Sequence, residues 1–171
     1  MSSIPLASLT PRAGLILRVG IASQTVVVLQ DGSPLAAFPV STSRYGCGET
    51  EGSHQTPRGW HVVAEKIGEA QPLGTVFKGR VPTGEMWDPS MPMDLENEDA
   101  DLILSRILWL DGTEPHNTNT KDRYIYFHGT NREDLIGTAA SIGCIRLRNH
   151  DMLSLYDLAD VGTPVCIDEY V

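Results

Sequence analysis

A histidine and a cysteine in the C-terminal half of the chain are the residues whose types and order most favour chemistry. His128-Gly129-Thr130 is followed, after a loop, by Ser141-Ile142-Gly143-Cys144-Ile145-Arg146. A thiol becomes a strong nucleophile when a neighbouring imidazole or oriented backbone N–H groups stabilise its thiolate. The block therefore predicts Cys144 as a nucleophile and His128, which ends an apolar strand, as its base.

The residues around the cysteine fit an acyl-transfer site. Gly143 lets the backbone turn sharply and leaves amide groups free to face a developing oxyanion. Arg146, two residues after the cysteine, could fix a carboxylate or carbonyl of a substrate near the sulfur. A phosphatase loop is excluded, because it would need an arginine six positions after the cysteine, where His150 stands.

A structural interpretation of the same residues stays open. A cysteine flanked by Ile142 and Ile145 is more often a small buried apolar residue than a nucleophile. A histidine at a strand end is often a satisfied structural residue, and Cys–His pairs meet in space and not in sequence. The spacing alone does not decide between the two interpretations.

Short apolar runs separated by turn residues predict the elements that position this block. The expected early strands are 15–19, 25–29, 35–41 and 60–65, with a hairpin turn at Asp31-Gly32-Ser33-Pro34. We expect residues 71–97 to form a long loop or lid, because they are rich in Pro, Gly, Met and acidic residues. Residues 102–110 fit a helix or a strand, and the Asp-Gly pair that follows favours a strand.

The later elements follow from clearer patterns. Residues 124–128 predict a strand that sends Tyr124, Tyr126 and His128 to one face. The two tyrosines would line a substrate groove or pack across strands. Asn149 is the expected N-cap of a helix that carries Met152, Leu153, Tyr156 and Ala159 on one side and closes near Gly162, before a final strand at 163–168. The fold class is therefore mainly β (α+β), a sandwich or barrel.

Composition fits one globular domain and excludes several function classes. The chain has 171 residues and a net charge of −9, which argues against nucleic acid and anionic lipid as partners. No apolar run reaches the length of a secretory signal or a membrane span. We therefore expect a cytoplasmic protein without a membrane span. Oligomeric state is not specified by the sequence.

Neither a metal nor a cofactor is predicted. Three cysteines form no even set and no C-x-x-C pair, which argues against a disulfide framework or a zinc ribbon. One cluster of possible ligands occurs early in the chain, but its spacing matches no common metal site, so we interpret its members as solvated polar residues. That cluster is Cys47, Glu49, Glu51, His54 and His61.

These motifs together resemble the YkuD-type L,D-transpeptidase catalytic domain. The hallmark of that family is a histidine followed by a Ser-His-Gly-Cys block, often continued as Ile-Arg; here the block reads Ser141-Ile142-Gly143-Cys144-Ile145-Arg146. Upstream, residues 24–29 with 38–42 are similar to its opening strands, and Thr56-Pro57-Arg58-Gly59 to its Thr-Pro-x-Gly turn. The resemblance covers roughly residues 15–167 of a single domain spanning 1–171.

The resemblance implies a YkuD-like sandwich of two packed mixed sheets with one or two short helices. It also implies cleavage of the bond between diaminopimelate and D-alanine in a peptidoglycan tetrapeptide, so a murein tetrapeptide or muropeptide is the expected partner. Cys144 would attack, His128 would take the thiol proton and the carbonyl of Gly129 would orient the imidazole. Backbone N–H groups of Gly143 and Cys144 would form the oxyanion hole. Substrate contacts are expected from Ser141, Tyr126 and Arg146.

The sequence departs from the family block at Ile142, which stands where the family has histidine. The change removes a polar group beside the thiol, on the side where an acceptor would bind. With no export signal visible, the expected substrates are soluble muropeptides and the expected acceptor is water, which makes an L,D-carboxypeptidase of murein recycling. The alternatives are an L,D-transpeptidase and a non-catalytic muropeptide-binding module.

Overall fold

A computed structural model describes residues 12–91 and 101–171, and its elements are mostly strands. In chain order they are β1 (Leu15–Gly20), β2 (Thr25–Gln30), β3 (Ser33–Pro39), β4 (Gly59–Ile67), β5 (Thr75–Lys78), β6 (Val81–Met86), β7 (Ile103–Gly112), β8 (Tyr126–Gly129), a 3-10 turn (Glu133–Leu135), β9 (Ile145–Leu147), α1 (Asn149–Leu158) and β10 (Pro164–Asp168).

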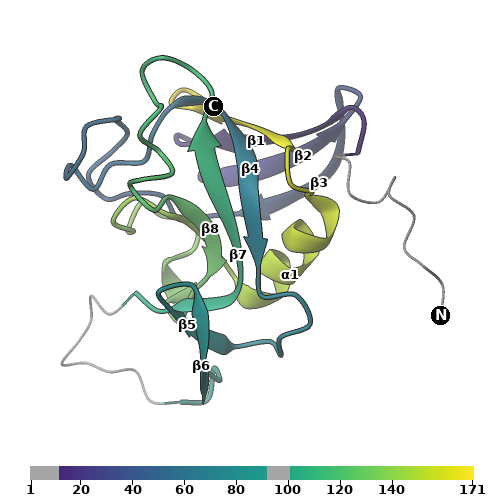
Figure 1. Ribbon diagram of the computed structural model, residues 1–171, viewed down its shortest axis with the longest axis vertical. Helices are drawn as coiled ribbons and strands as arrows, with labels where there is room; N and C mark the ends of the chain where they lie inside the picture. The colour runs from purple at the N-terminus through teal and green to yellow at the C-terminus, as the bar shows by residue number, and fades with distance from the viewer. Residues whose placement is uncertain (1–11, 92–100) are drawn as a thin grey trace.

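The strands form one mixed sheet in the order β3-β2-β1-β10-β4-β7-β5-β6, with β8 paired to β7 and β9 paired to β8. The β1–β10 and β8–β9 pairs are parallel and the other pairs are antiparallel. Because β7 pairs with β4, β5 and β8, the two sheets that the family resemblance implied are joined by hydrogen bonds into one. In Figure 1, β1–β3 run across the direction of β4 and β7, and the β5–β6 hairpin lies at the opposite end. The mainly β class is confirmed.

The main core lies where β1, β2, β7, β8 and β9 meet α1. Phe127 and Ile145 are fully buried neighbours in the β8–β9 pair and belong to this core. Met152 and Leu155 of α1 are also fully buried. A smaller cluster of Phe77, Ile107 and Tyr126 lies apart from it, and Cys144 packs against that cluster.

The predicted loop at 71–97 is wrong for its first part, because a hairpin of β5 and β6 occupies residues 75–86. Gly79 and Arg80 form its two-residue turn with φ angles of 55° and 64°, as a type I′ turn requires. Every residue of β6 is exposed, so this strand lacks the alternation of apolar residues that reveals a strand in sequence. Residues 92–97 of the predicted loop lie outside the described residues.

Two local predictions also need correction. Strand β8 begins at Tyr126, and Tyr124 has a φ of 58°, so Tyr124 lies before the alternating strand. Asn149 is the first helical residue and not the cap, which is Arg148. The Asn149 side chain is buried, donates to Thr130 O and accepts from Ser105 Oγ, so it joins α1 to the strands instead of capping the helix.

The buried face predicted for the helix is confirmed at Met152 and Tyr156. The prediction is wrong for Leu153, which is only half-buried, and Leu155 is the buried leucine of this face. Ala159 is also buried but follows the last helical residue, Leu158, as the C-cap in an extended conformation. The strand predicted at 102–110 is confirmed as β7.

Candidate active site

The parallel pairing of β8 with β9 brings the histidine and the cysteine to the same region. The register pairs Phe127 with Ile145 and His128 with Arg146. Extending it by one residue places Cys144 beside Tyr126. Because residues two apart in a strand share a face, His128 and Cys144 lie on the face opposite to the main core.

The thiol of Cys144 has two backbone contacts to the segment that begins β8. The Tyr126 N–H donates to Sγ at 3.4 Å, and the thiol donates to Tyr124 O at 3.3 Å. Cys144 is half-buried. In this resting arrangement the thiol proton therefore points to a carbonyl and has to move to reach the imidazole.

The imidazole of His128 is fully buried and oriented by its neighbour in the chain. Its Nδ1 lies 2.7 Å from the carbonyl oxygen of Gly129, and a carbonyl can only accept, so Nδ1 carries a proton. The other ring nitrogen, Nε2, is then the one that can accept a proton from a neutral thiol. The contact implied for Gly129 is thus present, and its catalytic role stays a prediction.

The electrostatics favour a neutral thiol beside a neutral imidazole. Burial raises the pKa of Cys144 to about 12, against a smaller lowering by the Tyr126 N–H. Burial also lowers the pKa of His128, against the raising effects of Asp101 and of Gly129 O. Near neutral pH the thiol keeps its proton, so attack on a carbonyl requires His128 to remove that proton during the step.

The turn that carries Cys144, the candidate nucleophile, is held by hydroxyl groups. Ser141 Oγ donates to Cys144 O at 2.6 Å and accepts from Gly143 N at 3.2 Å. Thr56 Oγ1 donates to Gly143 O at 3.0 Å from the loop before β4. Gly143 has a φ of 130°, a backbone conformation that residues other than glycine rarely adopt. These contacts fix the direction in which Cys144 projects.

Two of the predicted contacts look different in the structure. Ser141 is buried with its hydroxyl engaged, so it shapes the turn, and its contact with substrate stays a prediction. The Gly143 N–H, predicted for the oxyanion hole, already donates to Ser141. Among the described residues, nothing accepts a hydrogen bond from the Cys144 N–H, which leaves this group available to an oxyanion.

Arg146 is buried and connects the site to a carboxylate that the sequence analysis missed. Its guanidinium donates to Ser41 Oγ at 3.1 Å and lies 3.3 Å from Asp101 Oδ1. The other oxygen of Asp101 lies 3.9 Å from His128 Nε2. Asp101 ends an acidic stretch of the sequence at residues 94–101, and its place two residues before β7 was the only available signal.

Similarity to a known protein family identifies the family of this chain. Residues 15–167 match the model of the YkuD family, the L,D-transpeptidase catalytic domain. The chain belongs to this family.

Relatives and solved structures agree with that membership. The chain is 28% identical over 161 residues to the probable L,D-transpeptidase ErfK/SrfK of Escherichia coli, covering 92% of this chain and 44% of the relative. It is 33% identical over 110 residues to the probable L,D-transpeptidase YbiS of Escherichia coli, covering 62% of this chain and 36% of the relative. The chain thus spans less than half the length of these relatives.

The fold likeness extends to L,D-transpeptidase 3 from Mycobacterium tuberculosis in complex with a faropenem-derived adduct. Its TM-score is 0.58 at 19% identity, covering 93% of this chain and 61% of that chain. An L,D-transpeptidase from Xylanimonas cellulosilytica gives a TM-score of 0.56 at 19% identity, covering 93% and 63%. At this identity the likeness shows the YkuD fold.

A cavity of about 300 Å³ lies next to the nucleophile turn of this YkuD-family chain. Ile142, the residue at the family histidine position, is 47% exposed and lines it. Tyr124, whose carbonyl contacts the thiol, lines it as well. Glu51 and Asp122 contribute carboxylates. The departure at Ile142 therefore changes the wall of a cavity that reaches the turn before Cys144, although Cys144 itself does not line it.

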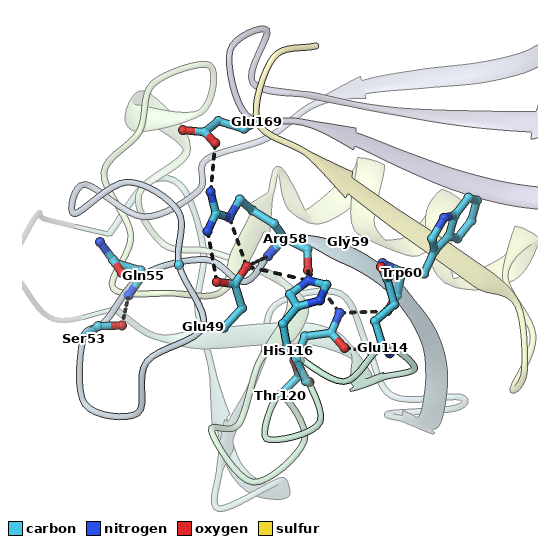
Figure 2. A network of polar contacts seen from close by, with 12 residues as sticks. Glu49, Ser53, Gln55, Arg58, Gly59, Trp60, Glu114, His116, Thr120 and Glu169 are labelled. Carbon is cyan, nitrogen blue, oxygen red and sulfur yellow. Dashed lines mark hydrogen bonds and ion pairs between the residues drawn. The ribbon is translucent and has the colours of Figure 1, made fainter.

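A polar network behind the site holds the loop that contains Thr56. Figure 2 shows Arg58 between Glu49 and Glu169, with His116 beside them. Arg58 Nε lies 3.0 Å from Glu49 Oε1, and its Nη1 lies 3.1 Å from Glu169 Oε2. Arg123 also binds this loop, donating to Gln55 O at 2.7 Å. The loop is thereby anchored on both sides of the residue that contacts Gly143.

Two of the polar residues considered as metal ligands have other partners. Glu49 is engaged by Arg58. The interpretation as a solvated polar residue is wrong for His61, which lies buried in β4 with its ring in contact with Gly59 O and Thr120 Oγ1. Within residues 12–91 and 101–171, no three His, Cys, Asp or Glu side chains are grouped so that they could hold a metal ion. No helix in the same ranges is long and apolar enough to cross a membrane.

Proposed function

We propose that this protein is a cysteine acyltransferase that cleaves the bond between diaminopimelate and D-alanine in peptidoglycan tetrapeptides, with water as the acceptor. The observation that carries the proposal is the geometry of β8 and β9, which places Cys144 and His128 on one face. The Gly129 carbonyl leaves Nε2 of His128 as the accepting nitrogen. Membership of the L,D-transpeptidase family supports the peptidoglycan substrate.

In the acylation step, His128 Nε2 takes the thiol proton as Sγ of Cys144 forms a bond to the carbonyl carbon of diaminopimelate. The Cys144 N–H donates to the oxyanion that develops. The C–N bond to D-alanine then breaks, and the leaving nitrogen takes the proton from the imidazolium. The products of this step are free D-alanine and a thioester on Cys144.

In the deacylation step, a water molecule replaces D-alanine near His128. His128 takes a proton from the water as its oxygen bonds to the thioester carbon. The C–S bond breaks, the sulfur recovers the proton from His128, and a tripeptide with a new carboxyl group leaves. The same chemistry with an amine in place of water gives a cross-link.

Ile142 supports water over an amine as the acceptor. The exposed side chain of Ile142 offers no hydrogen bond to an acceptor peptide in the cavity that it lines. Water requires no such binding site. A second candidate is transpeptidation, which is favoured by Glu51 and Asp122, because their carboxylates in the same cavity could attract an amine. A non-catalytic muropeptide-binding module would need neither Cys144 nor His128.

Mass spectrometry of the tetrapeptide and the disaccharide-tetrapeptide after incubation with the purified protein tests the proposal. We expect loss of one alanine in the wild type, no loss in Cys144→Ala, and unchanged turnover in the matched control Cys47→Ala. Dimeric products, or exchange of the terminal residue for an added D-amino acid, would support transpeptidation instead. Binding of either substrate without thioester formation would support the binding module and overturn both enzymatic proposals.

A further inference from the structure

The β5–β6 hairpin brings an arginine into the neighbourhood of the thiol. Arg80 is the second residue of the type I′ turn, so it projects from the tip of the hairpin. Strand β5 pairs with β7, which also pairs with β8, so the hairpin is fixed to the sheet that carries the site. The arginine is therefore supplied by an ordered element.

Aromatic rings hold the guanidinium of Arg80 in place. The group lies 4.8 Å from the ring centroid of Trp109 and 5.2 Å from that of Tyr124. Its Nη1 donates to the hydroxyl of Tyr126 at 3.1 Å. Trp109 in turn stacks on Tyr124 and meets Tyr126 edge-on, with centroids 6.0 and 5.6 Å apart. Such cation–π contacts orient a guanidinium without neutralising its charge.

Within the described residues, no carboxylate lies at ion-pair distance from Arg80. A second cation on the same ring behaves differently: Lys121 lies 5.0 Å from the Trp109 centroid and is paired with Glu65 at 3.2 Å. A guanidinium has five N–H donors, and Tyr126 accepts from one of its nitrogens. Arg80 thus keeps donors for an anionic group that the described chain does not supply.

Tyr126 connects this cation directly to the nucleophile. Its backbone N–H donates to Sγ of Cys144, while its hydroxyl accepts from Arg80. Burial raises the pKa of the Tyr126 phenol, so its hydroxyl keeps a proton to donate beside the guanidinium. An anion bound at Arg80 would lie one tyrosine side chain away from the thiol.

We propose that Arg80, together with the Tyr126 hydroxyl, binds a carboxylate of the acyl-donor peptide and so determines which peptides reach Cys144. This inference rests on the proposed function, because it names the donor of that reaction. The proposed substrate has two carboxylates near the scissile bond, one on the terminal D-alanine and one on the diaminopimelate side chain. Either one presents the planar pair of oxygens that a guanidinium binds through two parallel hydrogen bonds.

Steady-state kinetics with three peptides tests the inference. The peptides are the tetrapeptide, its D-alanine amide, and its diaminopimelate side-chain amide. We expect Arg80→Gln to raise KM for the tetrapeptide roughly 10- to 100-fold, the range for a lost charge-assisted hydrogen bond, with a smaller change in kcat. The wild type should discriminate against one amide, and Arg80→Gln should discriminate less. The amide against which only the wild type discriminates identifies the carboxylate that Arg80 binds.

Lys121→Gln is the matched control, because it removes a cation from the same Trp109 ring and should leave KM and selectivity unchanged. An Arg80→Gln variant with wild-type KM and selectivity would overturn the inference. Calorimetric titration of the tetrapeptide into Cys144→Ala separates the two proposals. Binding that depends on Arg80, together with no turnover by the protein that keeps Cys144, would overturn the proposed function alone. Turnover that ignores Arg80 would overturn the inference alone, and absence of both binding and turnover would overturn both.

Discussion

Oδ2 of Asp101 lies 3.9 Å from Nε2 of His128, the ring nitrogen that accepts the thiol proton in the proposed reaction. The other oxygen of this carboxylate lies 3.3 Å from Arg146. The negative charge raises the pKa of His128 and also that of Cys144, and among charged groups it is the main influence on His128. Asp101 therefore favours the imidazolium that forms when the thiol attacks.

Asp101→Asn keeps the shape of this side chain and removes its charge. Without the negative charge that raises it, the pKa of His128 falls further below its ordinary value. The acidic limb of the kcat/KM profile should therefore move to lower pH. The imidazolium is also less stabilised, and we expect kcat/KM at neutral pH to fall about 10-fold, or roughly 1.4 kcal/mol in activation free energy. The measurement is the pH dependence of tetrapeptide hydrolysis.

Asp134→Asn is the control for that experiment, since this exposed carboxylate pairs with Arg132 and does not touch His128. Its pH profile should match that of the wild type. Thermal unfolding of both variants checks the fold. An acidic limb that stays in place, or moves to higher pH, would show that Asp101 acts only through the position of Arg146.

Cys144 and His128 could be singled out from the sequence as candidate nucleophile and base, whereas Asp101 and Arg80 could not be placed near them. Cys144 and His128 occur in an ordered motif with a glycine beside each. Asp101 reaches His128 because β7 pairs with β8, with Leu104 opposite Gly129. Arg80 reaches Tyr126 because the β5–β6 hairpin pairs with β7, the strand that also pairs with β8. Both contacts depend on strand pairing between segments that no local pattern relates.

The same distinction applies to the fold. Buried strands such as β1 and β2 were predictable, because their apolar residues alternate or run continuously. Strand β6 was not, because all of its residues are exposed. The sequence pointed to Asn149 as a cap by residue type, yet its side chain is bound to Thr130 and Ser105. The preference of asparagine for helix N-caps is a local property of the chain, and at Asn149 tertiary hydrogen bonds outweigh it.

The pKa of Cys144 predicts how the free thiol reacts with iodoacetamide. Burial raises that pKa to about 12, and the thiolate is the reactive form. The alkylation rate should therefore rise about tenfold per pH unit from pH 7 to 10 without levelling off. An ordinary thiol, with a pKa of about 8.5, would level off above about pH 9.5. The measurement uses a variant with Cys47→Ala and Cys166→Ala, so that a single thiol reacts.

The same single-thiol variant in denaturant provides the control, and its rate should level off near the ordinary pKa. A folded-state rate that is already constant below pH 8 would contradict the neutral pair. It would show instead that Cys144 and His128 rest as a thiolate and an imidazolium.

Thr56→Val tests how the loop before β4 supports the nucleophile turn. Thr56 Oγ1 donates to Gly143 O and accepts from Ser43 N, each at 3.0 Å, and the residue is fully buried. Valine has the same shape but leaves both backbone groups unsatisfied. We expect the free energy of unfolding to fall by on the order of 2–4 kcal/mol. Turnover should fall at least about 10-fold, since small displacements of a nucleophile are costly.

Thr138→Val is the matched control, because the exposed Thr138 hydroxyl donates only to Leu135 O three residues earlier. Chemical denaturation and tetrapeptide turnover are measured for both variants. If Thr56→Val loses stability and keeps full turnover, the loop stabilises the fold without positioning Cys144.

His61, which does not contact the thiol of Cys144, makes the free energy of unfolding sensitive to acid. Burial lowers its pKa to about 4, while the unfolded chain has the ordinary value of about 6.5. As pH falls below 6.5 the unfolded state takes up a proton that the folded state does not, so stability is lost until pH 4. The contribution is about 3 kcal/mol. The lowered pKa of His128 adds a loss of the same sign.

His61→Gln should therefore lose less stability than the wild type between pH 7 and pH 4, because glutamine does not titrate. Urea denaturation at several pH values measures the slope. His150→Gln, which changes an exposed histidine on α1, should follow the wild type. Parallel curves for all three proteins would mean that His61 is protonated in the folded state at the ordinary pH, and that Gly59 O and Thr120 Oγ1 stabilise its charged form.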